Sequence, residues 1–168
     1  VLFRSHGRRV ASLALVNPWT YGDAHLCTMQ RLRVAAARAL GPADYSRFNS
    51  ALLFPPEYRR RHEVGFAELA AGARPQDADA IERRLEAILA FDARPLLTHI
   101  SAPTVVVSAR DDQLMPGWFA TEAAAALPVA ALAELDGGGH MLPETRTTEL
   151  LEIVQACLAK FDAAEPAA

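Results

Sequence analysis

The sequence predicts an α/β fold in which a parallel sheet of three strands carries a long helical insertion. Three short apolar runs, at residues 10–16, 104–108 and 129–135, show almost no alternation with polar residues. Such runs are typical of strands that are buried on both faces, as in a parallel sheet. Between the first two runs lie roughly 70 residues of helical character, too many for a simple crossover.

Residues that favour turns bound each of these runs. Asn17-Pro18 stops the first run, Pro103 precedes the second, and Pro128 and Gly137 bracket the third. The third run is rich in Ala and could be helical by propensity alone, but its brackets favour a strand.

Helical periodicity fills the rest of the chain. In the insertion, apolar residues recur at helical spacing over residues 26–40 and 81–89, and prolines divide the remainder into at least two shorter helices. Residues 118–127 are rich in Ala, and residues 150–161 carry an apolar stripe at helical spacing. These two helices complete a β-α-β-α order after residue 103, and we expect the C-terminal helix to pack on the sheet.

The chain divides into four predicted segments. Residues 1–23 and 92–161 form the core, residues 24–91 form the helical insertion, and residues 162–168 form a disordered Ala-rich tail. The chain begins with Val and shows no signal-peptide pattern. We therefore expect a fragment of a longer protein.

The composition is that of a globular chain and excludes several classes of protein. Of 168 residues, 51% are hydrophobic and 22% are charged, which suffices for a buried core. A net charge of −3 argues against nucleic-acid binding, and no apolar run is long enough to span a membrane. The two cysteines lie far apart, so we expect a cytoplasmic protein without a metal site or a cofactor.

Two residues with catalytic chemistry follow the second and third runs. Asp112 follows the second run, and His140 follows the third through the turn Gly137–Gly139. The carboxyl ends of adjacent parallel strands share one sheet edge, so we expect these side chains to lie side by side. A carboxylate that accepts the imidazole Nδ1–H fixes the tautomer and leaves Nε2 to take a proton from a nucleophile. The glycines would let the backbone turn sharply enough to direct the histidine inward.

Each of these residues also has a simpler interpretation. An aspartate after a strand often caps the next helix, and Asp111 could do this while Asp112 acts in catalysis. His140 could be an ordinary loop residue.

The motifs SARDDQLMP (108–116) and LDGGGHMLPE (135–144) resemble the acid and histidine segments of the α/β-hydrolase fold family. VASLALVNPW (10–19) resembles the strand of that family that leads into a helical cap. The resemblance implies a nucleophile–acid–histidine triad, in that chain order. In the family, a proline usually lies four residues after the catalytic acid. Pro116 lies four residues after Asp112, so the resemblance selects Asp112 over Asp111 as the acid.

VNPWTYGDAH and LLFPPEY extend the resemblance to a subgroup of enol-lactonases, cofactor-free haloperoxidase-like esterases and, most closely, the pyrimidine-utilisation D proteins. The family's nucleophile motif, G-x-S-x-G, is absent from the chain. Ser5 does not fit it, and Cys27 is an unsuitable substitute inside a helix of the cap. We expect the nucleophile and the oxyanion donors to lie upstream of residue 1.

Four further residues are candidates for substrate binding. Trp19, Tyr21 and His25 follow the first strand, and Met141 follows His140. They could form an amphipathic pocket wall, although each could equally be a packing residue.

The main hypothesis is a fragment of a serine hydrolase that cleaves a small ester, lactone, carbamate or aminoacrylate-type substrate in pyrimidine breakdown. The alternative is a non-catalytic binding domain on the same scaffold. The resemblance suggests a small-molecule substrate and a homodimer. We expect the isolated chain to be inactive, because the nucleophile is absent. We also expect it to be poorly soluble, because its first strand would be an exposed apolar edge.

Overall fold

The computed structural model describes residues 10–164 and divides into two compact units. The sheet unit lies within Val1–Thr20 and Ala93–Ala168, and the helical unit is Tyr21–Asp92.

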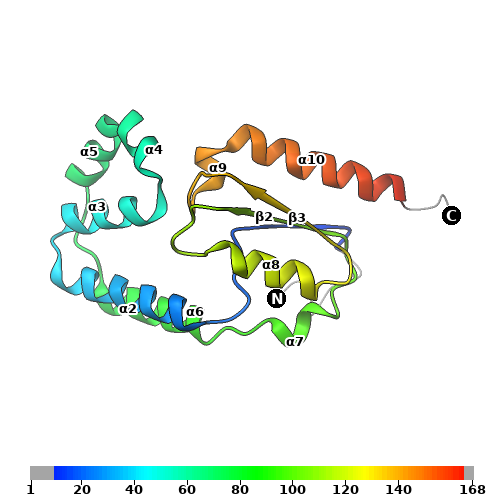
Figure 1. The fold of residues 1–168 in the computed structure, drawn as a ribbon. Helices are drawn as coiled ribbons and strands as arrows, with labels where there is room; N and C mark the ends of the chain where they lie inside the picture. Colours follow the sequence, from blue (N-terminus) through cyan, green and yellow to red (C-terminus); the bar gives the residue numbers. More distant parts are fainter. Residues whose placement is uncertain (1–9, 165–168) are drawn as a thin grey trace. The chain divides into compact units, whose positions relative to one another are not determined.

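The sheet unit contains three parallel strands in the order β1-β2-β3 (Figure 1). They are β1 (Leu13–Val16), β2 (Thr104–Ala109) and β3 (Ala130–Leu135). The register aligns Leu15 with Val106 and Val106 with Leu132. The predicted three-stranded parallel sheet is therefore confirmed, although β1 begins three residues after the start of its apolar run.

Burial differs between the strands. All six residues of β2 are buried, as expected for the central strand. The expectation of burial on both faces is wrong for β3, where four of six residues are exposed and Leu132 is 45% exposed. The reason is position: β3 pairs with β2 alone among the described strands, and its small alanine side chains cover little surface.

Helices pack on both faces of the sheet (Figure 1). They are α7 (Arg94–Leu97), α8 (Gly117–Ala126), α9 (Leu142–Thr145) and α10 (Thr147–Ala164). Alternate residues of β2 point to opposite faces. Val105 and Val107 therefore pack against Leu142 and Leu150 from α9 and α10, and Val106 packs on the α7 and α8 side.

The predicted C-terminal helix is longer than its apolar stripe suggested. Because α10 extends to Ala164, the first residues of the predicted disordered tail, 162–168, are helical instead. The helix continues because the tail is rich in Ala, the residue with the highest helix propensity. Residues 165–168 lie outside the described part of the chain, as does Ser5.

The helical unit consists of five helices. They are α2 (Ala24–Ala39), α3 (Pro42–Leu53), α4 (Pro56–Arg61), α5 (Glu63–Ala71) and α6 (Ala78–Leu89). Local chemistry sets their starts: α3 and α4 begin at prolines, and the side chains of Asp23 and Asp77 cap α2 and α6. Inside this unit, α2 packs on α6 and α3 packs on α5.

Candidate active site

Asp112 and His140 meet beyond the carboxyl ends of β2 and β3. The Nδ1 atom of His140 lies 2.8 Å from Oδ2 of Asp112. The Asp112 side chain is fully buried, and the His140 side chain is 24% exposed. The adjacent parallel strands thus bring the two side chains together, as the sequence predicts.

The remaining oxygen of Asp112 is held by the backbone that follows it. Oδ1 accepts hydrogen bonds from the amides of Leu114, at 2.8 Å, and Met115, at 2.9 Å. A buried carboxylate needs such partners, because burial without them is strongly unfavourable. Asp112 is therefore fixed in one orientation, with Oδ2 directed at the imidazole.

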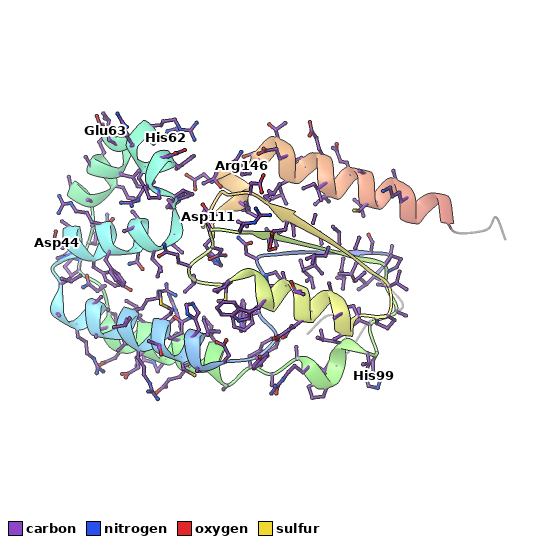
Figure 2. All side chains as sticks on the ribbon, viewed as in Figure 1. Asp44, His62, Glu63, His99, Asp111 and Arg146 are labelled. Atoms are coloured by element: carbon purple, nitrogen blue, oxygen red, sulfur yellow. The ribbon has the colours of Figure 1, made fainter. Side chains whose placement is uncertain are left out.

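Asp111 does not cap the next helix, so that alternative is wrong. The N-cap of α8 is Pro116, and Asp111 turns toward the histidine loop instead. Its Oδ1 accepts a hydrogen bond of 2.8 Å from the amide of Gly139. Figure 2 shows Asp111 at the end of the sheet where β2 and β3 stop, near Arg146 at the end of α9, and His99 at the opposite end.

The glycine turn before His140 has the conformation that the sequence predicts. Gly138 and Gly139 have φ angles of 131° and 64°, in a region that favours glycine. A Cβ atom on Gly138 would lie only 2.6 Å from Leu142 Cδ2 and 2.8 Å from Arg146 Cγ. The turn therefore requires glycine at Gly138 both for its backbone angle and for its close packing.

This arrangement can carry out proton transfer. A carboxylate beside Nδ1 holds the ring in the tautomer that carries its proton on Nδ1 and stabilises the imidazolium that forms when Nε2 takes a proton. Nε2 lies on the far side of the ring from Asp112. It is the nitrogen that can exchange a proton with a nucleophile or a leaving group.

The four predicted substrate-binding residues are divided between the two units. Trp19 and Met141 belong to the sheet unit, and both are half-buried. Tyr21 and His25 belong to the helical unit, where Tyr21 forms an antiparallel bridge with Asp92 and His25 lies in the first turn of α2. The structure joins two of the predicted residues, Asp112 and His140, by a side-chain hydrogen bond.

One residue near this pair is assigned no site role by the sequence. Asn17 follows β1 directly, is 4% exposed and has a φ angle of 44°. Its side chain contacts the histidine loop. The signal in the sequence is an Asn before a Pro at a strand end, since Asn tolerates positive φ better than most residues.

The described residues contain no cluster of three or more His, Cys, Asp or Glu that could hold a metal ion. Within residues 10–164, no helix is both long enough and apolar enough to cross a membrane.

The chain resembles known hydrolases in sequence, although no family model matches it. It is 34% identical over 134 residues to a protein of Azorhizobium caulinodans named "Putative carbamate hydrolase RutD". That match covers 79% of this chain and 51% of the relative. The chain therefore spans about half the length of this curated relative.

Solved structures extend the similarity to the fold. The enol-lactonase from Burkholderia xenovorans LB400 matches with a TM-score of 0.78 at 25% identity, over 94% of this chain and 60% of that one. An α/β-hydrolase from a Medee basin deep-sea metagenome matches with a TM-score of 0.75 at 15% identity. That match covers 97% of this chain and 60% of the other. The predicted resemblance is confirmed at the level of the fold: the chain has a partial α/β-hydrolase fold.

Proposed function

We propose that the chain is part of a serine hydrolase in which Asp112 is the catalytic acid and His140 is the catalytic base. The single observation that carries the proposal is the 2.8 Å contact between His140 Nδ1 and the buried Asp112 carboxylate. The similarity to proteins named as hydrolases supports it. The nucleophile is a serine supplied by sequence outside this chain, since the chain has no G-x-S-x-G motif.

The proposed reaction has two steps. The serine oxygen attacks the substrate carbonyl carbon while His140 Nε2 takes the hydroxyl proton, and the same proton then passes to the leaving group as its bond to carbon breaks. Water next attacks the acyl carbon while His140 takes one of its protons. The bond between that carbon and the serine oxygen then breaks, the acid product leaves, and the proton passes from His140 to the serine oxygen. Asp112 stays ionised throughout and stabilises the imidazolium.

The substrate is a small ester, lactone, carbamate or aminoacrylate-type compound. The relatives named as carbamate hydrolases favour the carbamate class. The resemblance to the pyrimidine-utilisation D proteins favours a role in pyrimidine breakdown. We propose that the helical unit has the role of a cap, and that Trp19, Tyr21, His25 and Met141 are substrate-binding residues. Their mixture of aromatic, thioether and hydrogen-bonding groups suits a small polar substrate with an apolar part.

Location and assembly are part of the same proposal. The two cysteines, Cys27 and Cys157, lie far apart in the sequence without CxxC spacing, which favours a reducing cytoplasm. The family resemblance favours a homodimer, and size-exclusion chromatography with light scattering tests it. A monomer at micromolar concentration would contradict the dimer but leave the reaction proposal intact.

A non-catalytic binding domain is the alternative. The Asp112–His140 pair argues against it, because a fully buried carboxylate is costly to desolvate and contributes little net stability to a fold. A scaffold that kept only a binding role would gain little from this pair.

The first test is to sequence the source DNA upstream of the Val1 codon. We expect an open reading frame that encodes further strands and ends in a G-x-S-x-G elbow shortly before the first described strand. A stop codon or unrelated sequence there would contradict the serine-hydrolase proposal and favour the binding domain.

The second test is activity of the complete protein, meaning this chain together with any such upstream sequence. We expect hydrolysis of p-nitrophenyl acetate, covalent labelling by a fluorophosphonate probe, and loss of hydrolysis in His140→Ala. His99→Ala is a matched control, because His99 is an exposed histidine at the opposite end of the sheet (Figure 2). A folded complete protein without hydrolysis or labelling would contradict the proposal.

A further inference from the structure

We propose that Asn17 is a positioning residue that holds the main chain of His140, and so sets the geometry of the Asp112–His140 pair. The inference rests on the proposed function for its kinetic consequence, but the hydrogen bonds that carry it are independent of any activity. It assigns a role to a residue that otherwise only ends a strand.

The Asn17 side chain joins three backbone segments of the sheet unit. Its Nδ2 atom donates to the carbonyl oxygens of Gly139, at 3.1 Å, and His140, at 2.9 Å. Its Oδ1 atom accepts from the amide of Ala109, at 3.1 Å, at the end of β2. The end of β1 thus links the end of β2 to the loop that carries the histidine.

An asparagine suits this position for two separate reasons. The site needs a donor for two carbonyls and an acceptor for one amide, and a side-chain amide offers both on neighbouring atoms. The backbone of Asn17 has a φ angle of 44°, which asparagine adopts more readily than most residues with a side chain. Its own amide donates to Val107 at 2.8 Å, so the strand pairing continues up to the turn.

Burial makes these hydrogen bonds hard to replace. Asn17 is 4% exposed, and Gly139 and Ala109 are also buried. Without the Asn17 side chain, water could not readily reach the backbone carbonyls and amide that now bond to it. A buried backbone group without a partner is unfavourable. Loss of the donor should therefore make the loop move rather than leave it in place.

The histidine loop needs external support because it is built on glycine. Gly138 and Gly139 have the greatest backbone freedom of any residue type, so their sequence alone does not define the loop. The structure restrains the loop from three sides: Asp111 holds the Gly139 amide, Thr145 Oγ1 donates to the Gly138 carbonyl at 2.6 Å, and Asn17 holds the next two carbonyls. Of these three, Asn17 alone bonds the backbone of His140 itself.

The position of His140 should affect the rate of the reaction more than it affects the binding of substrate. A hydrogen bond of 2.8 Å between His140 and Asp112 requires the ring to be placed within about 0.5 Å. A displacement of the catalytic group by about 1 Å can lower a rate by about 100-fold. We therefore expect loss of the Asn17 side-chain hydrogen bonds to lower kcat about 10- to 100-fold, with little change in KM.

The test uses Asn17→Asp and Asn17→Gly in the complete protein. Asn17→Asp keeps an acceptor for Ala109 but places a carboxylate oxygen against two carbonyls. Asn17→Gly accepts the positive φ angle without strain and removes the side chain, so it keeps the test valid if the Asp variant does not fold. Asn49→Asp is the matched control, since Asn49 also donates to one backbone carbonyl, that of Tyr45, in the helical unit.

Two readouts are measured on each variant: the low-field proton NMR signal of His140 Nδ1 without substrate, and kcat with KM. We expect both Asn17 variants to lose or broaden the signal and to lower kcat, and Asn49→Asp to retain both. An Asn17→Gly variant that is less stable to heat but keeps the signal and kcat would overturn the inference and leave Asn17 a structural residue.

The two proposals fail in distinguishable ways. If the signal is lost in the Asn17 variants while the unsubstituted protein hydrolyses nothing, the positioning role stands and the proposed function falls. If the unsubstituted protein is active and the variants keep both signal and kcat, the positioning role falls and the proposed function stands.

Discussion

Asp111 accepts a hydrogen bond from the amide of Gly139, the residue that immediately precedes His140. Its neighbour Asp112 holds the His140 ring. Two consecutive carboxylates thus restrain the backbone and the side chain of one loop. They differ in burial, since Asp111 is exposed and Asp112 is 3% exposed. Their substitution should therefore have very different effects.

In the complete protein, Asp112→Asn should lower kcat by about 10⁴-fold, the effect of replacing the triad aspartate in a serine protease. An amide in place of the carboxylate favours the wrong imidazole tautomer and cannot stabilise the imidazolium. Steady-state kinetics with a chromogenic ester measure the change. Asp111→Asn is the matched control: it keeps an acceptor for Gly139 and should lower kcat less than about tenfold. The reverse order of effects would identify Asp111 as the acid.

Gly138→Ala should destabilise the sheet unit by about 1–3 kcal/mol and reduce activity. The φ angle of 131° is strained for alanine, and the new Cβ would lie 2.6 Å from Leu142 Cδ2. Urea unfolding of the complete protein measures the loss.

Gly65→Ala is the control for that substitution. Gly65 lies inside α5, and a Cβ there meets nothing within 4 Å. We expect it to stabilise the protein by about 0.5–1 kcal/mol, because alanine favours a helix. Equal unfolding free energies for the two alanine variants would contradict the packing argument.

The sequence predicts the sheet and the acid–base pair because both depend on short patterns. The apolar run Thr104–Ser108 can be buried on both faces in only a few ways, and parallel pairing then brings the residues after β2 and β3 to one edge. The exposure of β3 was not predictable from its composition, because alanine suits a strand, a helix, an edge or a core.

The contacts of Asn17 and Asp111 lie beyond sequence reasoning for a different reason. Asn17 reaches Gly139 across a sequence separation of 122 residues, and the contact depends on a single backbone turn with positive φ. A polar residue at a strand end has many local partners available, as the capping interpretation of Asp111 illustrates. Only the assembled loop decides between these partners.

Leu142→Ala should lower the free energy of unfolding by about 2–5 kcal/mol. Leu142 is fully buried, packs in the core cluster with Val105 and Val107, and lies directly under Gly138. The cavity would loosen the support of the histidine loop, so kcat should fall with stability. Leu132→Ala is the control, because Leu132 is 45% exposed on β3 and its loss should change stability by less than about 0.5 kcal/mol. Chemical denaturation of both variants provides the comparison.

Arg33→Met should leave the stability of the helical unit unchanged or raise it. Burial lowers the pKa of Arg33, which means that the folded protein disfavours the charged guanidinium. Its Nη1 atom donates to Gln30 Oε1 at 3.1 Å, and its buried Nε atom has no hydrogen-bond partner. Methionine keeps the apolar stem and removes the desolvated charge, which is neutral or stabilising at comparable buried sites.

Thermal unfolding near pH 7 tests this prediction. Arginine stays protonated at that pH, so the cost of burying the charged guanidinium is fully present. Arg38→Met is the matched control on the same helix, because the guanidinium of Arg38 is exposed and pairs with Glu82 and Asp79. Exposed pairs contribute less than about 1 kcal/mol, so that variant should melt at or slightly below the unsubstituted protein. A clearly lower melting temperature for Arg33→Met than for Arg38→Met would show that the Arg33 guanidinium stabilises the fold through the contact with Gln30.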